Sequence, residues 1–204
     1  MNNNEWAVNI FQRLEEIGLP SLLKNQTGWF HNMDVWFAEN CKFIESLGVR
    51  LRHGLTKVCL IAEDRDEVIK VPFKPERGTR DFCTQEYRNY LLAEKEGLEQ
   101  FFAPIRYVDM VNGVPVYLQE KEDVDPTVVS DSLRSYYENE YCEEYESGWT
   151  TLDEDETVIA LLGESEEVYR LRNFILDNEI NDLHSGNWGV NSCGDLVIID
   201  YSGF

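Results

Sequence analysis

Aspartate and asparagine side chains near the end of the chain could hold a divalent cation and activate a hydroxyl group. Residues 181–187 (NDLHSGN) form a polar loop in which Asp182 is followed five residues later by Asn187. A turn and the apolar run 196–199 then place Asp200 at the end of a buried strand. Two oxygen donors on adjacent rigid elements suit Mg²⁺, which prefers oxygen ligands and bridges phosphates. A separate carboxylate in the loop could orient a hydroxyl nucleophile.

A lysine and a glutamate further upstream lie on elements whose faces the sequence predicts. Residues 67–70 (EVIK) predict part of a strand, and strand alternation puts Val68 and Lys70 on one face. A helix is predicted over about residues 81–96, with Glu86 at the border of its apolar stripe.

The elements that must position these side chains predict an α+β fold. Short β-rich segments between turn residues predict five antiparallel strands, with one helix inserted after the third. Asn112-Gly113, between two apolar runs, is a strong hairpin signal. Two helices are expected within residues 1–48, the first ending at Gly18 and Pro20. The predicted strands are 51–54, 57–62, 67–73, 105–111 and 114–118, and a further helix is expected over 164–178.

Charge excludes several classes of function. The 204 residues include 39 acidic and 18 basic ones, for a net charge of −21. This balance argues against direct binding to a nucleic-acid backbone and against docking on an anionic membrane. Residues 120–167 hold 17 of the acids against two bases, a net charge of −15, and predict helices with an acidic solvent face. That face is either a solvated surface or a docking surface for a basic protein partner.

Cysteine usage and the N-terminus predict a cytoplasmic protein. Five scattered cysteines without a CxxC pattern are typical of reduced thiols. The first residues lack the basic start and apolar run of a signal peptide, and no apolar stretch reaches the roughly 20 residues of a membrane span. The three histidines lie far apart in the sequence, which argues against a zinc site.

Taken in order, these elements make residues 50–204 resemble the protein-kinase-like superfamily. The Asp-x-x-x-x-Asn spacing and the distance from Asn187 to Asp200 match the family pattern. The sequence DLHSGN at 182–187 is similar to the catalytic loop of the aminoglycoside- and choline-kinase branch. The sequence EVIK at 67–70 resembles the Val-Ala-Ile-Lys motif of the family. The resemblance implies a minimal kinase-like fold with a five-stranded N-lobe sheet, a reduced, mostly helical C-lobe and extra N-terminal helices.

The same resemblance implies ATP and Mg²⁺ as cofactors and assigns roles to individual residues. Asp182 would be the catalytic base, and His184 would approach the terminal phosphate. Lys70 would pair with Glu86 and reach the phosphates. Val68 would cover the adenine ring, and residues 118–121 would form the hinge. The implied catalytic residues are Asp182, Lys70, Glu86 and His184, the nucleotide-binding residues are Gly54, Val58, Val68, Lys70, Gln119 and Glu120, and the metal ligands are Asn187 and Asp200.

Two departures from the family pattern leave two functions open. The phosphate loop at residues 52–58 has one glycine, which means fewer backbone amides close to phosphate. The chain ends at Phe204, so a truncated C-lobe is expected, with an N-terminal extension at 1–48, an N-lobe at 49–118 and an acidic C-lobe at 119–204. One function is an ATP/Mg-dependent phosphotransferase of unknown acceptor. The alternative is a non-catalytic, pseudokinase-type binding or inhibitor protein whose acidic surface docks a basic partner.

Overall fold

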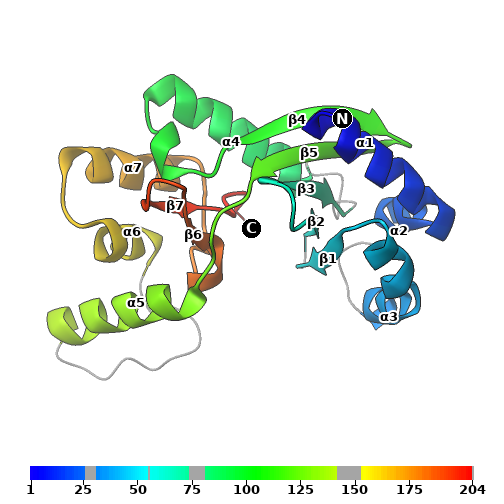
Figure 1. The fold of residues 1–204 in the computed structure, drawn as a ribbon. Helices are drawn as coiled ribbons and strands as arrows, with labels where there is room; N and C mark the ends of the chain where they lie inside the picture. Colours follow the sequence, from blue (N-terminus) through cyan, green and yellow to red (C-terminus); the bar gives the residue numbers. More distant parts are fainter. Residues whose placement is uncertain (26–30, 55, 74–80, 142–152, 204) are drawn as a thin grey trace. The chain divides into compact units, whose positions relative to one another are not determined.

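The computed structural model describes residues 1–25, 31–54, 56–73, 81–141 and 153–203. Within these ranges the chain is an α+β protein with a five-stranded antiparallel sheet and seven α-helices (Figure 1). It divides into two compact units. Unit 1 comprises Met1–Tyr87 and Pro104–Lys121, and unit 2 comprises Arg88–Ala103 and Glu122–Phe204. The predicted division at residues 48 and 118 refers to kinase-like lobes and stays a prediction.

The sheet of unit 1 has the strand order β1-β2-β3-β5-β4. Its strands are β1 (Arg50–His53), β2 (Lys57–Ile61), β3 (Glu67–Pro72), β4 (Ile105–Val111) and β5 (Val114–Glu120). Helix α4 (Phe82–Glu96) follows β3, so the prediction of five strands with one inserted helix is confirmed. Asn112 and Gly113 join β4 to β5 with φ angles of 52° and 76°, the positive values that a tight hairpin turn requires.

Helices precede the sheet, as predicted, but they are more numerous than the pattern indicated. They are α1 (Asn3–Arg13), α2 (Leu19–Asn25) and α3 (His31–Ser46), with a 3₁₀ turn at Leu14–Ile17. Asn2 and Glu5 form a capping box at the start of α1. Gly18, with φ of 76°, ends the first helical stretch. The prediction for Pro20 was wrong, because Pro20 lies in the first turn of α2, where a missing N–H group needs no partner.

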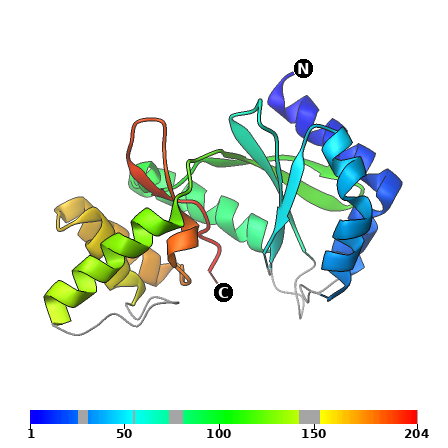
Figure 2. The ribbon, with the colours of Figure 1, turned by 60° about the horizontal axis from the view of Figure 1, so that its bottom comes forward.

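One face of the sheet and the N-terminal helices share the hydrophobic core of unit 1 (Figure 2). Alternate residues of β2 and β3 point into this core, which follows from the two-residue period of a strand. Fully buried members from the sheet include Val58, Leu60, Ile69, Val71 and Val116. The members from the first helical stretch include Trp6, Phe11 and Leu14. The remaining residues of β2 and β3 therefore face the other side of the sheet.

Unit 2 is mostly helical and ends in a short hairpin. Its elements after α4 are α5 (Pro126–Tyr141), α6 (Glu154–Leu162), α7 (Glu166–Asp177), β6 (Trp188–Val190) and β7 (Leu196–Ile198). Ser165 caps α7, whose predicted apolar stripe of Val168, Leu171 and Ile175 is buried. The acidic segment is helical in α5 and α6, as predicted, while its residues 142–152 lie outside the described residues.

In the described ranges, no helix combines the length and apolarity needed to cross a bilayer. Four of the five cysteines are free thiols, at positions 41, 59, 83 and 193. Cys142 lies outside the described residues.

Candidate functional site

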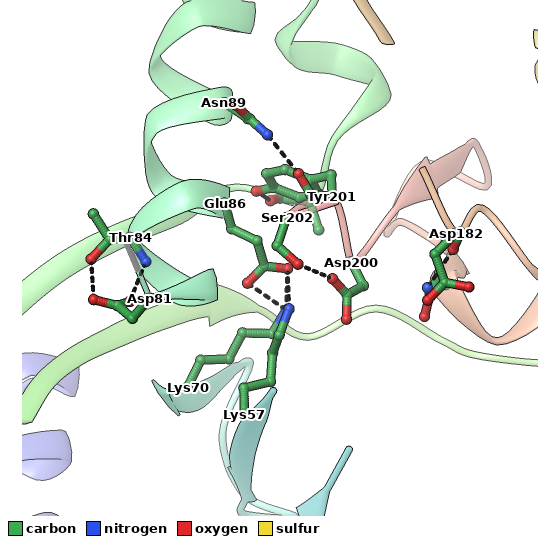
Figure 3. Close-up of polar contacts among 12 residues, drawn as sticks. Lys57, Lys70, Asp81, Thr84, Glu86, Asn89, Asp182, Asp200, Tyr201 and Ser202 are labelled. Carbon is green, nitrogen blue, oxygen red and sulfur yellow. Dashed lines mark hydrogen bonds and ion pairs between the residues drawn. The ribbon is translucent and has the colours of Figure 1, made fainter. Parts of the chain in front are cut away.

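Two lysines and one glutamate meet in unit 1, on the sheet face opposite the hydrophobic core (Figure 3). Lys70 Nζ lies 3.0 Å from Glu86 Oε1 and 3.3 Å from Glu86 Oε2. Lys57 Nζ lies 3.1 Å from the same Oε1. Each lysine is 4% exposed and Glu86 is 0% exposed. The pairing of Lys70 with Glu86 was expected from the sequence, whereas Lys57 was not assigned to the site.

Strand register explains why the two lysines share a face. In the β2–β3 ladder, Cys59 lies opposite Lys70, and Lys57 lies opposite Pro72. Residues that are directly paired across an antiparallel ladder point to the same side, and so do residues two apart on one strand. Lys57, Cys59 and Lys70 therefore occupy one face. The pattern of β2 alone could have indicated Lys57, because it alternates with the buried residues of the core face.

The start of α4 fixes the position of Glu86. Asp81 accepts hydrogen bonds from the backbone N–H of Thr84, at 2.7 Å, and from its hydroxyl, at 2.8 Å. This is a helix N-cap, which satisfies a backbone donor that has no partner within the helix. The Thr84 hydroxyl also lies 2.6 Å from the hydroxyl of Tyr117 on β5. The first turn of α4 is thus tied to the sheet at Thr84, two residues before Glu86.

Cys83 lies beside this cluster and is fully buried. Burial raises the pKa of its thiol well above the ordinary value, and the positive charges of Lys57 and Lys70 oppose that shift only in part. The thiol is therefore neutral near pH 7. It consequently contributes no negative charge beside the two ammonium groups, both of which contact the Glu86 carboxylate.

The predicted nucleotide-binding side chains separate onto two faces of the sheet. Val68 is half-buried and shares a face with Lys70, and Gln119 lies opposite Val68 in the β3–β5 ladder with 2% exposure. The structure thus brings these two side chains to the face that carries Lys70. Val58 pairs with Val71 instead and is completely buried in the core. Val58 is not on the Lys70 face, because it is one residue out of phase with Lys57.

Two of the predicted nucleotide-binding residues, Gly54 and Glu120, use their backbone N–H groups within unit 1. The Gly54 N–H donates to the carbonyl of Lys57 at 3.1 Å, which closes the β1–β2 turn. The Glu120 N–H donates to the carbonyl of Pro104 at 2.9 Å. Leu55, within the predicted phosphate loop, lies outside the described residues. Gly54 and Glu120 are exposed, but neither can offer its own N–H to a ligand without breaking a sheet hydrogen bond.

In unit 2, the polar loop before β6 is held in a specific conformation. Asp182 has a φ of 72°, a left-handed value that non-glycine residues adopt rarely. Its N–H donates to Glu154 Oε1 at 3.2 Å, and its carbonyl accepts from Asn187 Nδ2 at 2.7 Å. His184 Nδ1 accepts the N–H of Gly186 at 3.0 Å, so the other ring nitrogen carries the proton when this histidine is neutral.

The two proposed metal ligands emerge from the same end of the β6–β7 hairpin. The backbone N–H of Ile199 donates to the carbonyl of Asn187 at 2.9 Å, and Asp200 is the next residue. Since Asn187 Nδ2 is bound to the loop, its Oδ1 is the atom left for a cation. Asp200 is half-buried and accepts a hydrogen bond from the Ser202 hydroxyl at 3.0 Å (Figure 3).

This donor set fits Mg²⁺. It consists of an amide oxygen and a carboxylate on rigid elements, and Mg²⁺ is commonly held by one or two such groups plus water and phosphate oxygens. Among the residues that the structure describes, no cluster of three or more His, Cys, Asp or Glu side chains suits a metal held by protein alone. Asn187 and Asp200 would therefore supply part of a coordination shell.

Asp200 is followed by a residue that sequence reasoning missed. Tyr201 is fully buried, and its hydroxyl donates to the carbonyl of Ala103 at 2.6 Å. Its own carbonyl accepts from the buried amide of Asn89 at 2.7 Å, and its ring packs 5.0 Å from that of Phe102. These contacts fix the backbone beside Asp200. The signal available in the sequence was a large aromatic residue directly after the proposed metal ligand.

Comparisons with known proteins include a distant structural similarity to a solved structure. No protein-family model matches this chain, and none of the curated proteins does. Among solved structures, the chain is similar to a co-crystal structure of WbdD and the kinase inhibitor LY294002, with 17% sequence identity and a TM-score of 0.30. The similarity covers 75% of this chain and 32% of that chain, so this chain spans about a third of the length of its match.

Proposed function

We propose that this protein is an ATP- and Mg²⁺-dependent phosphotransferase of minimal kinase-like type. The observation that carries the proposal is the buried ion pair of Lys70 and Glu86, which joins a strand to the following helix. Burying both charges costs free energy that an apolar pair of similar size would not cost. A lysine held in this way presents a fixed positive charge, which suits the phosphates of a nucleotide.

The remaining roles follow the motif order of the sequence. Asn187 and Asp200 would hold Mg²⁺, which neutralises phosphate charge when it is bound. Asp182 would accept the proton of an acceptor hydroxyl as that oxygen bonds to the terminal phosphorus and ADP leaves. His184, through its protonated ring nitrogen, would donate a hydrogen bond to the terminal phosphate. The chemical identity of the acceptor stays open.

Transfer of labelled terminal phosphate from ATP tests this function. The full chain, incubated with Mg²⁺-ATP and candidate hydroxyl acceptors or with itself, should transfer label. Asp182→Asn should lower the rate at least about 100-fold, because a positioned base contributes factors of about 10²–10⁴. Asp195→Asn is the matched control, since Asp195 is an exposed carboxylate in the β6–β7 turn. Full activity in Asp182→Asn would refute the mechanism.

Nucleotide binding is tested separately from transfer. Mg²⁺-ATP at 100 times its dissociation constant should raise unfolding free energy by about 2.7 kcal/mol, which a melting curve detects. Lys70→Met and Asp200→Asn should reduce this shift, while Asp195→Asn should leave it unchanged. No shift in the natural chain would refute nucleotide binding and favour the second candidate function.

The second candidate is a non-catalytic protein that docks a basic partner through its acidic surface. It is favoured by the exposure of most described acidic side chains in residues 120–167, among them Asp131, Glu138, Glu140, Glu164, Glu166 and Glu167. A basic partner protein retained by the natural chain should be released by Glu138→Lys combined with Glu140→Lys. Retention that survives this reversal would refute docking through α5.

A further inference from the structure

Asp182 has a backbone conformation that its surroundings must hold in place. Its φ of 72° lies in the left-handed region, which glycine adopts freely and a residue with a Cβ adopts at a cost. Glycine would not serve at this position in the proposed function, because the base needs a carboxylate. Such conformations persist where neighbouring contacts over-determine them, and they cluster at functional sites. The contacts of the Asp182 backbone therefore indicate what positions this residue.

One of these contacts comes from the start of helix α6. The Asp182 N–H donates to Oε1 of Glu154 at 3.2 Å, and Glu154 is the first residue of α6, 28 positions earlier in the chain. A hydrogen bond to a carboxylate is stronger than one between neutral groups. Glu154 thus holds the peptide group before Asp182, while the Asn187 amide holds the peptide group after it. With both peptide groups held, the bond from Cα to Cβ of Asp182 has one direction.

The first turn of α6 is itself anchored, so that Glu154 has a fixed place. The next residue, Asp155, accepts a hydrogen bond from Arg172 Nε at 2.8 Å, which joins α6 to α7. Val158, one turn further along α6, is completely buried. Glu154 is half-buried, unlike exposed acids of the same acidic segment such as Glu138. It therefore differs from the solvated face of that segment in both its contact and its burial.

We propose that Glu154 is a positioning residue that holds Asp182 in its left-handed conformation and so directs the Asp182 carboxylate. The inference rests on the proposed phosphotransferase function and adds a residue of the acidic segment to its site. Glu154 acts through the Asp182 backbone, so its loss should affect turnover and leave nucleotide binding unchanged. A reacting group misplaced by about 1 Å can lose about 100-fold in rate.

Steady-state transfer of labelled terminal phosphate by the full chain tests this role. Glu154→Met removes the acceptor and should lower kcat at least about tenfold, while KM for Mg²⁺-ATP changes less than about twofold. Glu154→Gln keeps an acceptor oxygen and should retain more than about a third of the natural kcat. Glu166→Met is the matched control, because Glu166 is the exposed first residue of α7 and its loss removes the same charge from the same helix position. It should behave like the natural chain.

The amide signal of Asp182 in NMR spectra follows the hydrogen bond independently of activity. The signal should move in Glu154→Met and stay near its natural position in Glu154→Gln and Glu166→Met. An unmoved signal in Glu154→Met would overturn the inference, because the Asp182 N–H would then not depend on Glu154.

The kinetic outcomes separate this inference from the function on which it rests. Equal kcat in the natural chain and Glu154→Met would overturn the role of Glu154 and leave the phosphotransferase function intact. A loss in Glu166→Met as large as that in Glu154→Met would also overturn it, because charge at a helix start would then account for the effect. A natural chain that transfers no phosphate would overturn both. If Glu154→Met fails to fold, Glu154→Asp, which keeps the charge but is one methylene shorter, should show the same selective loss of kcat.

Discussion

Replacing Glu86 with glutamine removes the negative charge shared by Lys57 and Lys70 while it keeps the size of the side chain. Both ammonium nitrogens lie within 3.1 Å of one carboxylate oxygen, so they are no more than about 6 Å apart. At an effective dielectric constant of about 20, two unit charges at that separation repel by about 3 kcal/mol. Removing one partner of a buried ion pair costs about 3–5 kcal/mol, and the second lysine places Glu86→Gln at the upper end.

Urea denaturation of the full chain measures this cost. Glu86→Gln should lower the unfolding free energy by about 4–5 kcal/mol. Adding Lys57→Met to that variant should recover about 2–3 kcal/mol, because only one buried ammonium group then faces the neutral amide and the repulsion between the two lysines is gone. Glu94→Gln, at an exposed position of the same helix, is the control and should change stability by less than about 0.5 kcal/mol.

The double variant decides whether the two lysines are coupled through Glu86. If the effects of Glu86→Gln and Lys57→Met simply add, Lys57 does not interact with Glu86 and the three-charge cluster is not an energetic unit. A loss of unfolding free energy below about 1 kcal/mol in Glu86→Gln would refute the reasoning more directly, since replacing a buried carboxylate that contacts two lysines is expected to cost several times as much.

Three further perturbations test other contacts in the same way. Gly186→Ala should lower the unfolding free energy by about 1–3 kcal/mol, because the added Cβ would lie 2.9 Å from His184 Cε1. The NMR signals of the His184 ring should also shift. Gly54→Ala is the control, since a Cβ at that position meets nothing within 4 Å, and it should have little effect. Burial raises the pKa of Tyr117 to about 12, whereas an unfolded tyrosine ionises near pH 10. The contribution of the neutral phenol to the unfolding free energy is therefore complete below pH 10 and is lost as the pH rises toward 12. In unfolding curves measured over that pH range, the natural chain should lose about 2–3 kcal/mol relative to Tyr117→Phe. Parallel curves for the two proteins would contradict this prediction. Tyr201→Phe should cost about 1–3 kcal/mol in urea unfolding, since it leaves a buried carbonyl without its hydroxyl donor.

The sequence predicted the sheet well because its signals are local. Two-residue alternation identifies a strand, and Asn112-Gly113 fixes a hairpin turn through the backbone angles that these residues tolerate. The Lys70–Glu86 pair was expected from the family resemblance, and strand period and helix period agree with it because each defines a face. Helix α2 was not predicted, because seven residues are too few to establish a period and Pro20 reads as a helix end.

Whether another strand residue faces the site or the core depends on which side of the sheet the N-terminal helices cover. The sequence of a single strand does not specify that side. Val58 and Lys57 are neighbours in the sequence but lie on opposite faces, so an assignment one residue out of phase exchanges a core position for a site position. The anchoring of Tyr201 by Asn89 joins positions 112 residues apart. No periodicity within either segment contains that information.

The charge of the whole chain and the charge of the cluster have to be considered together. A net charge of −21 repels an anionic nucleotide, but this repulsion is screened beyond about 8 Å at physiological ionic strength. Affinity for phosphate is therefore decided by charges close to the ligand and poorly exposed to water. Lys57 and Lys70 are two of only 18 basic residues, and both are buried against one carboxylate. The proposed ATP binding therefore requires positive charge close to the phosphates, and Lys70 is the buried lysine that the proposal assigns to them.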